Sequence, residues 1–361
     1  MPETIRSDPP QEKFNTDKER LEFLEKRIVE RVQSMANQVR DEFEKDLEAR
    51  TQEPDIDSEN QSQTHEKRRQ KLKKGADFYK TTKLNILKGL GDLRRELEQS
   101  TRFGDYIPEL NALIDAVRTI YLSQLKVKHK EYRVMTEAPQ LSDEEITEQE
   151  RLTEDMTESR SLVQWYVIQN ESNPDYLTDL FNVFRNIMSR LGFESNWRGA
   201  ERGLRQELGV FKILSKCFKK VIPGNPKEDA HYAIDFWAKT NNGTNVIFQS
   251  KSSFVRLDDG IYGEEQISDL EKELSASPIA SIRYQKDLSG QEMPTSDLVK
   301  VKKLQQDIKK AKEYAQSQGI DNPHFYLIVS RADKYKEITG EPDSQATKSI
   351  ENDLWQISTL F

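Results

Sequence analysis

Residues 232–254 read YAIDFWAKTNNGTNVIFQSKSSF and have the pattern of two short strands joined by a tight turn. Asn and Gly tolerate the positive φ angles of a short hairpin, and they are concentrated at residues 241–243. Because side chains alternate between the two faces of a strand, Gln249 and Lys251 share one face of the returning strand. If the two strands are neighbours, Asp235 on the first strand converges with them.

These residue types suit a divalent metal and a phosphate. Mg²⁺ or Mn²⁺ takes oxygen ligands, so the Asp235 carboxylate, the Gln249 amide oxygen and the Ser250 backbone carbonyl form a partial ligand shell. Lys251 is then placed to hold the attacking water or to offset charge on the phosphate. The structural alternative is that Asp235 begins a turn, Gln249 is an edge polar residue and Lys251 extends to solvent. The metal site is favoured, because polar side chains inside an apolar strand cost desolvation free energy.

The spacing of Asp235, Gln249 and Lys251 resembles the PD-(D/E)xK, or restriction-endonuclease-like, nuclease superfamily. It is most similar to the D…QxK branch, as in Mrr-like restriction endonucleases and the endonuclease subunits of some transposases. The resemblance implies an αβββαβ restriction-endonuclease-like core with a mixed central sheet and metal-dependent cleavage of DNA. The chain departs from the family pattern twice. Ile234 stands where Pro is usual, and Gln249 replaces Glu, which gives the metal less charge.

The same resemblance implies further acidic residues upstream. Family members usually carry an acid on the helix before the first core strand, and residues 198–218 read as an amphipathic helix. Glu207 is the candidate acid on this helix, with Glu201 as the alternative. Many members carry one more acid shortly before the metal-binding Asp, and Glu228 and Asp229 are the candidates for it.

Between that helix and the hairpin, a short strand is expected at residues 218–222. Two prolines and a glycine then predict an irregular loop over residues 223–229. By strand alternation His231 shares a face with Asp235, where it would contact a phosphate or tune the metal shell. The alternative is a structural role, which is more common for a lone histidine.

The downstream sequence is consistent with the rest of such a core. Residues 296–319 have apolar side chains at helical spacing, with Gly319 as the C-terminal stop. Residues 324–330 are a continuous apolar run of strand character. Residues 255–295 predict an insertion, with a short helix and a strand at residues 281–285.

The N-terminal half has a different pattern, in which apolar residues recur at steps of three and four. The clearest stretches are residues 20–50, 75–100 and 106–132, whereas residues 51–69 lack an apolar cluster. The fold class predicted for the whole chain is therefore α+β. Its predicted parts are a disordered N-terminus at 1–19, a helical bundle or coiled-coil region at 20–197 with a flexible linker at 51–74, and a nuclease-like domain at 198–361.

Length and composition limit the class of protein and its possible partners. A length of 361 residues predicts about two domains, and 35% hydrophobic with 33% charged residues is typical of a soluble chain. We expect no membrane partner, because no apolar run is long enough to span a bilayer and no apolar signal segment begins the chain. The single Cys217 leaves no intramolecular disulfide and fits the cytoplasm. No zinc-type Cys and His spacing and no GxxxxGK loop occur, so a nucleotide cofactor is not expected.

Charge weighs against a protein that coats DNA. The net charge is −8, and from residue 198 onward 24 basic residues face 24 acidic ones. Binding to DNA would then depend on local basic patches, although charge runs are more often solvated faces. The candidates for contact with DNA are Lys212, Lys216, Lys302, Lys303 and Lys310.

The main hypothesis is a metal-dependent DNA endonuclease in restriction or antiphage defence, or in mobile-element processing. Its catalytic residues would be Asp235, Gln249, Lys251 and Glu207, with Mg²⁺ or Mn²⁺ as cofactor. The main alternative is a catalytically inactive nuclease fold that binds nucleic acid or protein. In either case the helical region offers a surface for a protein partner or for homo-oligomerisation, and a third hypothesis is that the protein is a coiled-coil scaffold.

Overall fold

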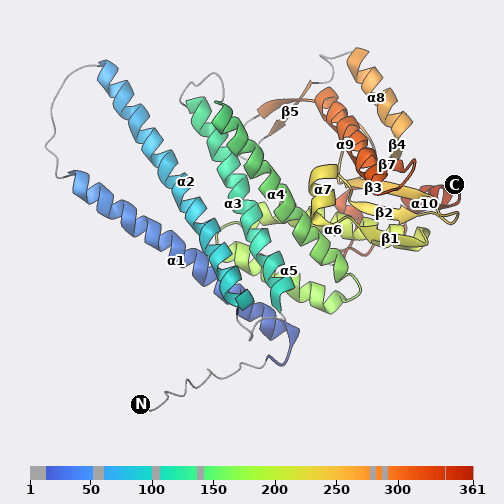
Figure 1. Ribbon diagram of the computed structural model, residues 1–361, viewed down its shortest axis with the longest axis horizontal. Helices are drawn as coiled ribbons and strands as arrows, with labels where there is room; N and C mark the ends of the chain where they lie inside the picture. The colour runs from blue at the N-terminus through green and yellow to red at the C-terminus, as the bar shows by residue number, and fades with distance from the viewer. Residues whose placement is uncertain are drawn as a thin grey trace. The chain divides into compact units, whose positions relative to one another are not determined.

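The protein is described here from a computed structural model. It covers residues 14–51, 61–99, 106–135, 142–276, 282–286, 292–337 and 339–360. The chain is α+β, with a helical N-terminal region followed by a mixed five-stranded sheet and its covering helices (Figure 1). Contacts divide it into a helical unit, Met1–Met156 with Thr178–Glu194, and a sheet unit, Thr157–Leu177 with Ser195–Phe361.

Long helices form the N-terminal region, and α1 packs along α2 (Figure 1). The apolar stripe predicted for the first helix is confirmed, since Leu24 and Ile28 of α1 and Leu90 of α2 are fully buried. The helices are α1 (Asp17–Thr51), α2 (Gln61–Gln99), α3 (Ile107–Met135), α4 (Asp143–Gln169) and α5 (Pro174–Arg190). None of the described helices is both long enough and apolar enough to cross a membrane.

Local signals fix where α4 and α5 begin and end. Ser142 and Glu145 form a capping box at the start of α4, in which the Glu145 N–H donates to Ser142 Oγ at 3.2 Å and the Ser142 N–H donates to Glu145 Oε2 at 2.9 Å. Pro174 is the first residue of α5, and Gly192 follows its end with φ of +78°.

Two predicted boundaries change. Helix α2 already begins at Gln61, so much of the linker predicted at residues 51–74 is helical. Gln, Lys, Arg and Glu are strong helix formers even without an apolar stripe, which explains the difference. Residues 52–60 lie outside the described part. The disorder expected at residues 1–19 falls largely on residues 1–13, which also lie outside it, and α1 is helical from Asp17.

The five strands are ordered β1-β2-β3-β7-β4 (Figure 1). Strands β3 and β7 pair in parallel and the other neighbours are antiparallel. The predicted hairpin is present, with Lys239 opposite Asn245. The strands are β1 (Lys220–Pro223), β2 (Phe236–Lys239), β3 (Asn245–Lys251), β4 (Gly260–Gly263) and β7 (His324–Val329).

Helices cover both faces of the sheet. On one face α6 (Glu194–Cys217) contributes Phe211, whose ring lies 6.0 Å from that of Phe236. On the other face α8 (Glu264–Ala276) and α9 (Asp297–Ser317) bury Ile247 of β3 and Leu327 of β7 in a common core. In chain order α6, β1, β2, β3, α9 and β7 follow the predicted order, but they are interleaved with additional helices and strands, among them the sheet strand β4.

The segments between these elements hold structure that the sequence did not predict. The expected irregular loop at residues 223–229 contains α7 (Pro226–Tyr232), because Asn225 and Glu228 form a capping box and Pro226 occupies the first turn. The insertion contains α8 and β5 (Ile282–Lys286), close to prediction. Further elements are β4, β6 (Glu292–Ser296), the short 3₁₀ helix η3 (Ala332–Lys334) and α10 (Lys348–Leu360).

The predicted domain boundary at residue 197 also moves. The end of α4 and the start of α5 group with the sheet unit as Thr157–Leu177. Within this segment the Tyr166 and Tyr176 hydroxyls share a buried hydrogen bond. The sheet unit is therefore built from two separate stretches of sequence.

Candidate functional site

Asp235 directly precedes β2, and only 4% of it is exposed. Its backbone N–H donates to the Phe248 carbonyl at 3.1 Å, and its Oδ2 accepts from the Ser250 N–H at 2.7 Å. The Gly224 N–H donates to the Asp235 carbonyl at 2.8 Å. Asp235 is thus fixed between β3 and the chain that leaves β1.

Strand β3 brings two more polar side chains to Asp235. Phe236 pairs with Phe248 in the antiparallel register, so Asp235 lies opposite Gln249. Gln249 is 3% exposed, and among the described residues its Oε1 has no hydrogen-bond partner. Lys251 follows two residues later on the same face and is half-buried. The structure therefore brings together the three residues that define the D…QxK pattern.

Helix α6 adds Glu207, which is 4% exposed. Its Oε1 accepts a hydrogen bond from Arg160 Nη2 at 3.1 Å, and its Oε2 has no partner in the part of the chain that the structure describes. The preceding residue, Gln206, donates a hydrogen bond to Ser250 Oγ and so holds α6 against β3. Glu207 lies close enough to Lys251 to interact with it electrostatically.

The carboxylates of this cluster are costly to ionise. Burial raises the pKa of Glu207 to about 7, against the opposing effect of Arg160 and with a further increase from Asp229. Burial and the charge of Asp229 also raise the pKa of Asp235 well above its usual value, although Lys251 opposes this. A bound cation would favour the ionised form of both groups.

The atoms present fit an oxygen-binding cation. Gln249 Oε1 and Glu207 Oε2 are buried oxygens without a partner among the described residues, whereas buried polar atoms are normally paired. Such atoms also occur elsewhere, for example Glu109 Oε2 in α3, so these two are distinguished by their place in the cluster with Asp235. No group of three or more His, Cys, Asp or Glu side chains among the described residues is arranged to hold a metal ion. A metal here would thus need the Gln249 amide oxygen, and the Ser250 backbone carbonyl is a further candidate, in addition to Asp235.

No protein-family model, curated protein or solved structure matches this chain. The resemblance to D…QxK nucleases therefore rests on the site residues themselves. What the site can do follows from their contacts, burial and charge.

Of the other acidic candidates, only Asp229 joins the cluster. It lies on α7 and acts on the pKa of both buried carboxyl groups. Its neighbour Glu228 has structural contacts, since it caps the Asn225 N–H at 2.9 Å and accepts from the Tyr314 hydroxyl at 3.2 Å. Glu201 precedes the buried acid of α6 by six residues, which at 100° per residue places it on a different face of the helix.

The predicted position of His231 is wrong. His231 lies in α7 rather than on a strand, and Ala233 ends this helix with φ of +54°. Alternation of side chains therefore does not extend from Asp235 back to His231. Its Nε2 lies 2.7 Å from Glu158 Oε1 of α4, which gives it a structural contact.

The candidate lysines fall into two groups. Lys212 and Lys216 on α6 form ion pairs with Glu341 and Glu351, the latter at 3.5 Å. Their charge is thus partly neutralised within the protein.

Lys302, Lys303 and Lys310 are exposed on α9. Burial raises the pKa of Asp307 on the same helix, while Lys303, Lys251 and Lys310 each lower it. Lys303 and Lys310 therefore lie near the same carboxylate as Lys251, so this part of α9 adjoins the site. Asp307 was not predicted from the sequence.

Arg160 is the other site residue that sequence reasoning missed. It lies on α4, which the sequence assigns to the helical region, and 47 positions separate it from Glu207. No periodicity or motif links the two residues. Only the tertiary fold brings them together.

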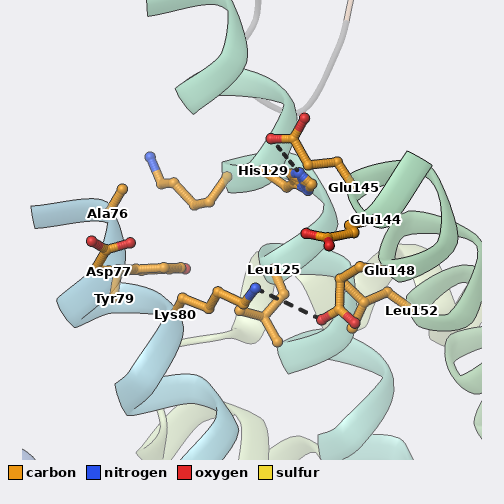
Figure 2. A pocket seen from close by; sticks show the side chains of 11 residues that line it. Ala76, Asp77, Tyr79, Lys80, Leu125, His129, Glu144, Glu145, Glu148 and Leu152 are labelled. Carbon is orange, nitrogen blue, oxygen red and sulfur yellow. Dashed lines mark ion pairs between the residues drawn. The ribbon is translucent and has the colours of Figure 1, made fainter. Parts of the chain in front are cut away.

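A hollow of about 310 Å³ lies in the helical unit among α2, α3 and α4 (Figure 2). Two of its four acidic residues are paired, with Lys80 Nζ 3.9 Å from Glu148 Oε1 and His129 Nε2 3.8 Å from Glu145 Oε1. None of its described lining residues has a buried polar atom without a partner. It therefore lacks the feature that marks the sheet site. Its lining residues are Ala76, Asp77, Tyr79, Lys80, Leu125, Lys128, His129, Glu144, Glu145, Glu148 and Leu152.

Proposed function

We propose that this protein is a metal-dependent DNA endonuclease that hydrolyses phosphodiester bonds. The observation that carries the proposal is a pair of buried oxygens, Gln249 Oε1 and Glu207 Oε2, that have no partner in the described part of the chain and belong to the same cluster as the buried carboxylate of Asp235. Unpaired buried oxygens cost free energy in an isolated chain, and a bound cation would offset that cost. The natural setting we propose is restriction or antiphage defence, or mobile-element processing.

Asp235, Gln249 and the Ser250 carbonyl would hold Mg²⁺ or Mn²⁺, with Glu207 as a further acid. The cation would supply charge stabilisation at the scissile phosphate and a more acidic bound water. Lys251 would donate hydrogen bonds to a phosphate oxygen and offset negative charge that develops there during attack. Arg160 keeps Glu207 oriented through its hydrogen bond at 3.1 Å.

The test is cleavage of supercoiled plasmid and of linear single- and double-stranded DNA with Mg²⁺, Mn²⁺ or EDTA. We expect metal-dependent cutting by the wild type and a loss of about a hundredfold or more in Asp235→Ala and in Lys251→Ala. Matched controls are Asp321→Ala and Lys348→Ala, which alter exposed residues and should cut normally. Cleavage that persists in both site variants would refute the assignment of the site.

The second candidate is an inactive nuclease fold that binds DNA or a protein. It is favoured by the neutral Gln249 and by the lack of a three-ligand His, Cys, Asp or Glu group among the described residues. The Gln249→Glu variant distinguishes the active nuclease from the inactive fold in the same DNA-cleavage assay. An active site should keep or gain metal-dependent cutting when it receives a carboxylate, whereas a docking surface should stay inert with either residue. The helical region would serve oligomerisation or a protein partner in both cases.

A further inference from the structure

Arg160 connects the buried cluster with solvent. Its Nη2 donates to Glu207 Oε1 at 3.1 Å, yet 59% of the Arg160 side chain is exposed. Glu207, by contrast, is almost entirely buried. One N–H group of the guanidinium is thus held by Glu207, while the Arg160 side chain as a whole lies at the protein surface.

The charge of Arg160 is directed at the whole cluster. The proximity of Glu207 raises the pKa of Arg160, and Asp229 and Asp235 add to this effect. A guanidinium carries five N–H donors in a planar fork, which matches the oxygens of a phosphate. Its hydrogen bond to Glu207 uses one of them, so the fork has further N–H groups to offer a ligand.

A glycine on α6, Gly203, lies next to the Arg160 side chain. Gly203 lies one helical turn before Glu207, and a methyl group at Gly203 would already stand 3.8 Å from Arg160 Nη2. That distance is an ordinary van der Waals contact, so Gly203 and the guanidinium are direct neighbours. Two residues before Arg160, the contact between Glu158 and His231 ties α4 to α7.

We propose that Arg160 is a DNA-binding residue of this site, whose guanidinium contacts a backbone phosphate next to the buried carboxylates. The two α6 lysines are paired with acids away from the cluster, and Lys303 and Lys310 approach from α9, whereas Arg160 is hydrogen-bonded directly to one of the buried carboxylates. An arginine at the rim of an acidic cluster would bind the phosphate and reduce its repulsion from the carboxylates. The inference rests on the proposed nuclease function and assigns part of its DNA contact.

The test measures binding of a fluorescently labelled DNA duplex by anisotropy in EDTA, over a range of salt concentrations. Arg160→Gln should weaken binding about tenfold at low salt. It should also reduce the slope of log Kd against log salt by about 0.9, the value for one phosphate contact. Arg160→Lys should restore most of the slope, because it keeps the charge.

Arg151→Gln is the matched control. Arg151 lies on the same helix and is likewise paired with acids, namely Glu148 and Asp155, but it does not contact the site residues. It should leave affinity and salt slope unchanged. The melting temperature of every variant shows whether it is folded.

Two outcomes separate this inference from the proposed function. If the wild type cuts plasmid DNA with Mg²⁺ but Arg160→Gln keeps the wild-type affinity and slope, the inference is overturned and the nuclease stands. If the folded wild type neither binds nor cuts any of the DNA substrates, both fail. Weaker binding by Arg160→Gln with an unchanged slope would indicate a structural effect and would also overturn the inference.

Discussion

Asp235 is a carboxyl group placed where an ionised form is hard to solvate. Water reaches little of it, Asp229 repels its negative charge, and Lys251 compensates only in part. One backbone N–H, from Ser250, donates to it. A chain without a bound cation therefore becomes less stable when this group ionises.

Asp235→Asn should accordingly stabilise the protein in EDTA. An acid whose folded pKa is raised binds its proton more tightly when folded, so stability falls as the pH rises from the unfolded pKa through the folded one. Asn stays neutral and can still accept from the Ser250 N–H. The variant should melt above the wild type at pH 8, and the difference should shrink toward pH 4.

Asp321→Asn, at an exposed position, is the control and should show no such pH-dependent gain. A lower melting temperature for Asp235→Asn at every pH would contradict the argument. The readout is independent of catalysis, because only unfolding is measured.

At the residue scale, the sequence is informative where the chemistry is local. Asp235, Gln249 and Lys251 lie on one hairpin, so strand alternation is enough to bring them together. Arg160 and Asp307 come from distant helices, and their place at the site depends on how those helices pack. No pattern within either helix carries that information.

At the scale of elements, the connection between β1 and α7 passes very close to the residue before Asp235. A Cβ added at Gly224 would stand 2.0 Å from the Ile234 carbonyl oxygen, which is part of the backbone and cannot rotate away. Only glycine permits this approach, and the hydrogen bond from the Gly224 N–H to the Asp235 carbonyl depends on it.

Gly224→Ala should therefore displace the backbone that positions Asp235. We expect a loss of about 1–3 kcal/mol in the free energy of unfolding, typical of overpacking, together with weaker DNA cleavage. Urea denaturation followed by circular dichroism gives the first quantity. Gly91→Ala in α2 is the matched control, because a Cβ added there meets nothing within 4 Å. If Gly224→Ala is as stable as the wild type, the backbone can relax at Gly224 and the expectation is wrong.

The sequence predicts those helices and strands that have a long apolar periodicity of their own. Helix α9 and strand β7 have long apolar patterns and are confirmed. Helix α7 has seven residues with none buried, so its capping residues are its only signal. Strand β4 is four residues long with a glycine at each end, and its place in the sheet comes from pairing with β7. Helix α10 does have apolar residues at helical spacing, and the interpretation of the sequence omitted it.

At the scale of the whole molecule, the sheet unit is not one continuous stretch. Residues 198–361 alone lack the segment Thr157–Leu177, which includes Arg160 and the buried Val163 and Tyr166. They also lack the buried Trp197. This fragment should be less stable than residues 157–361 by roughly 5 kcal/mol, the transfer free energy of about three buried side chains.

Thermal melts of the two fragments, followed by circular dichroism, would test this expectation. The longer fragment should unfold cooperatively and the shorter one at a much lower temperature or without a transition. Equal melting temperatures would mean that residues 157–177 contribute little to the fold of the sheet unit.

The interrupted layout of the sheet unit also affects how such a chain can evolve. A recombination event near residue 197 would separate Arg160 from Glu207, since the two lie on opposite sides of that point. A descendant that exchanged its N-terminal half would then inherit a buried acid without its arginine. The C-terminal end of α4 and the site are thus expected to be inherited together, and new combinations should arise by breakpoints that fall before residue 157.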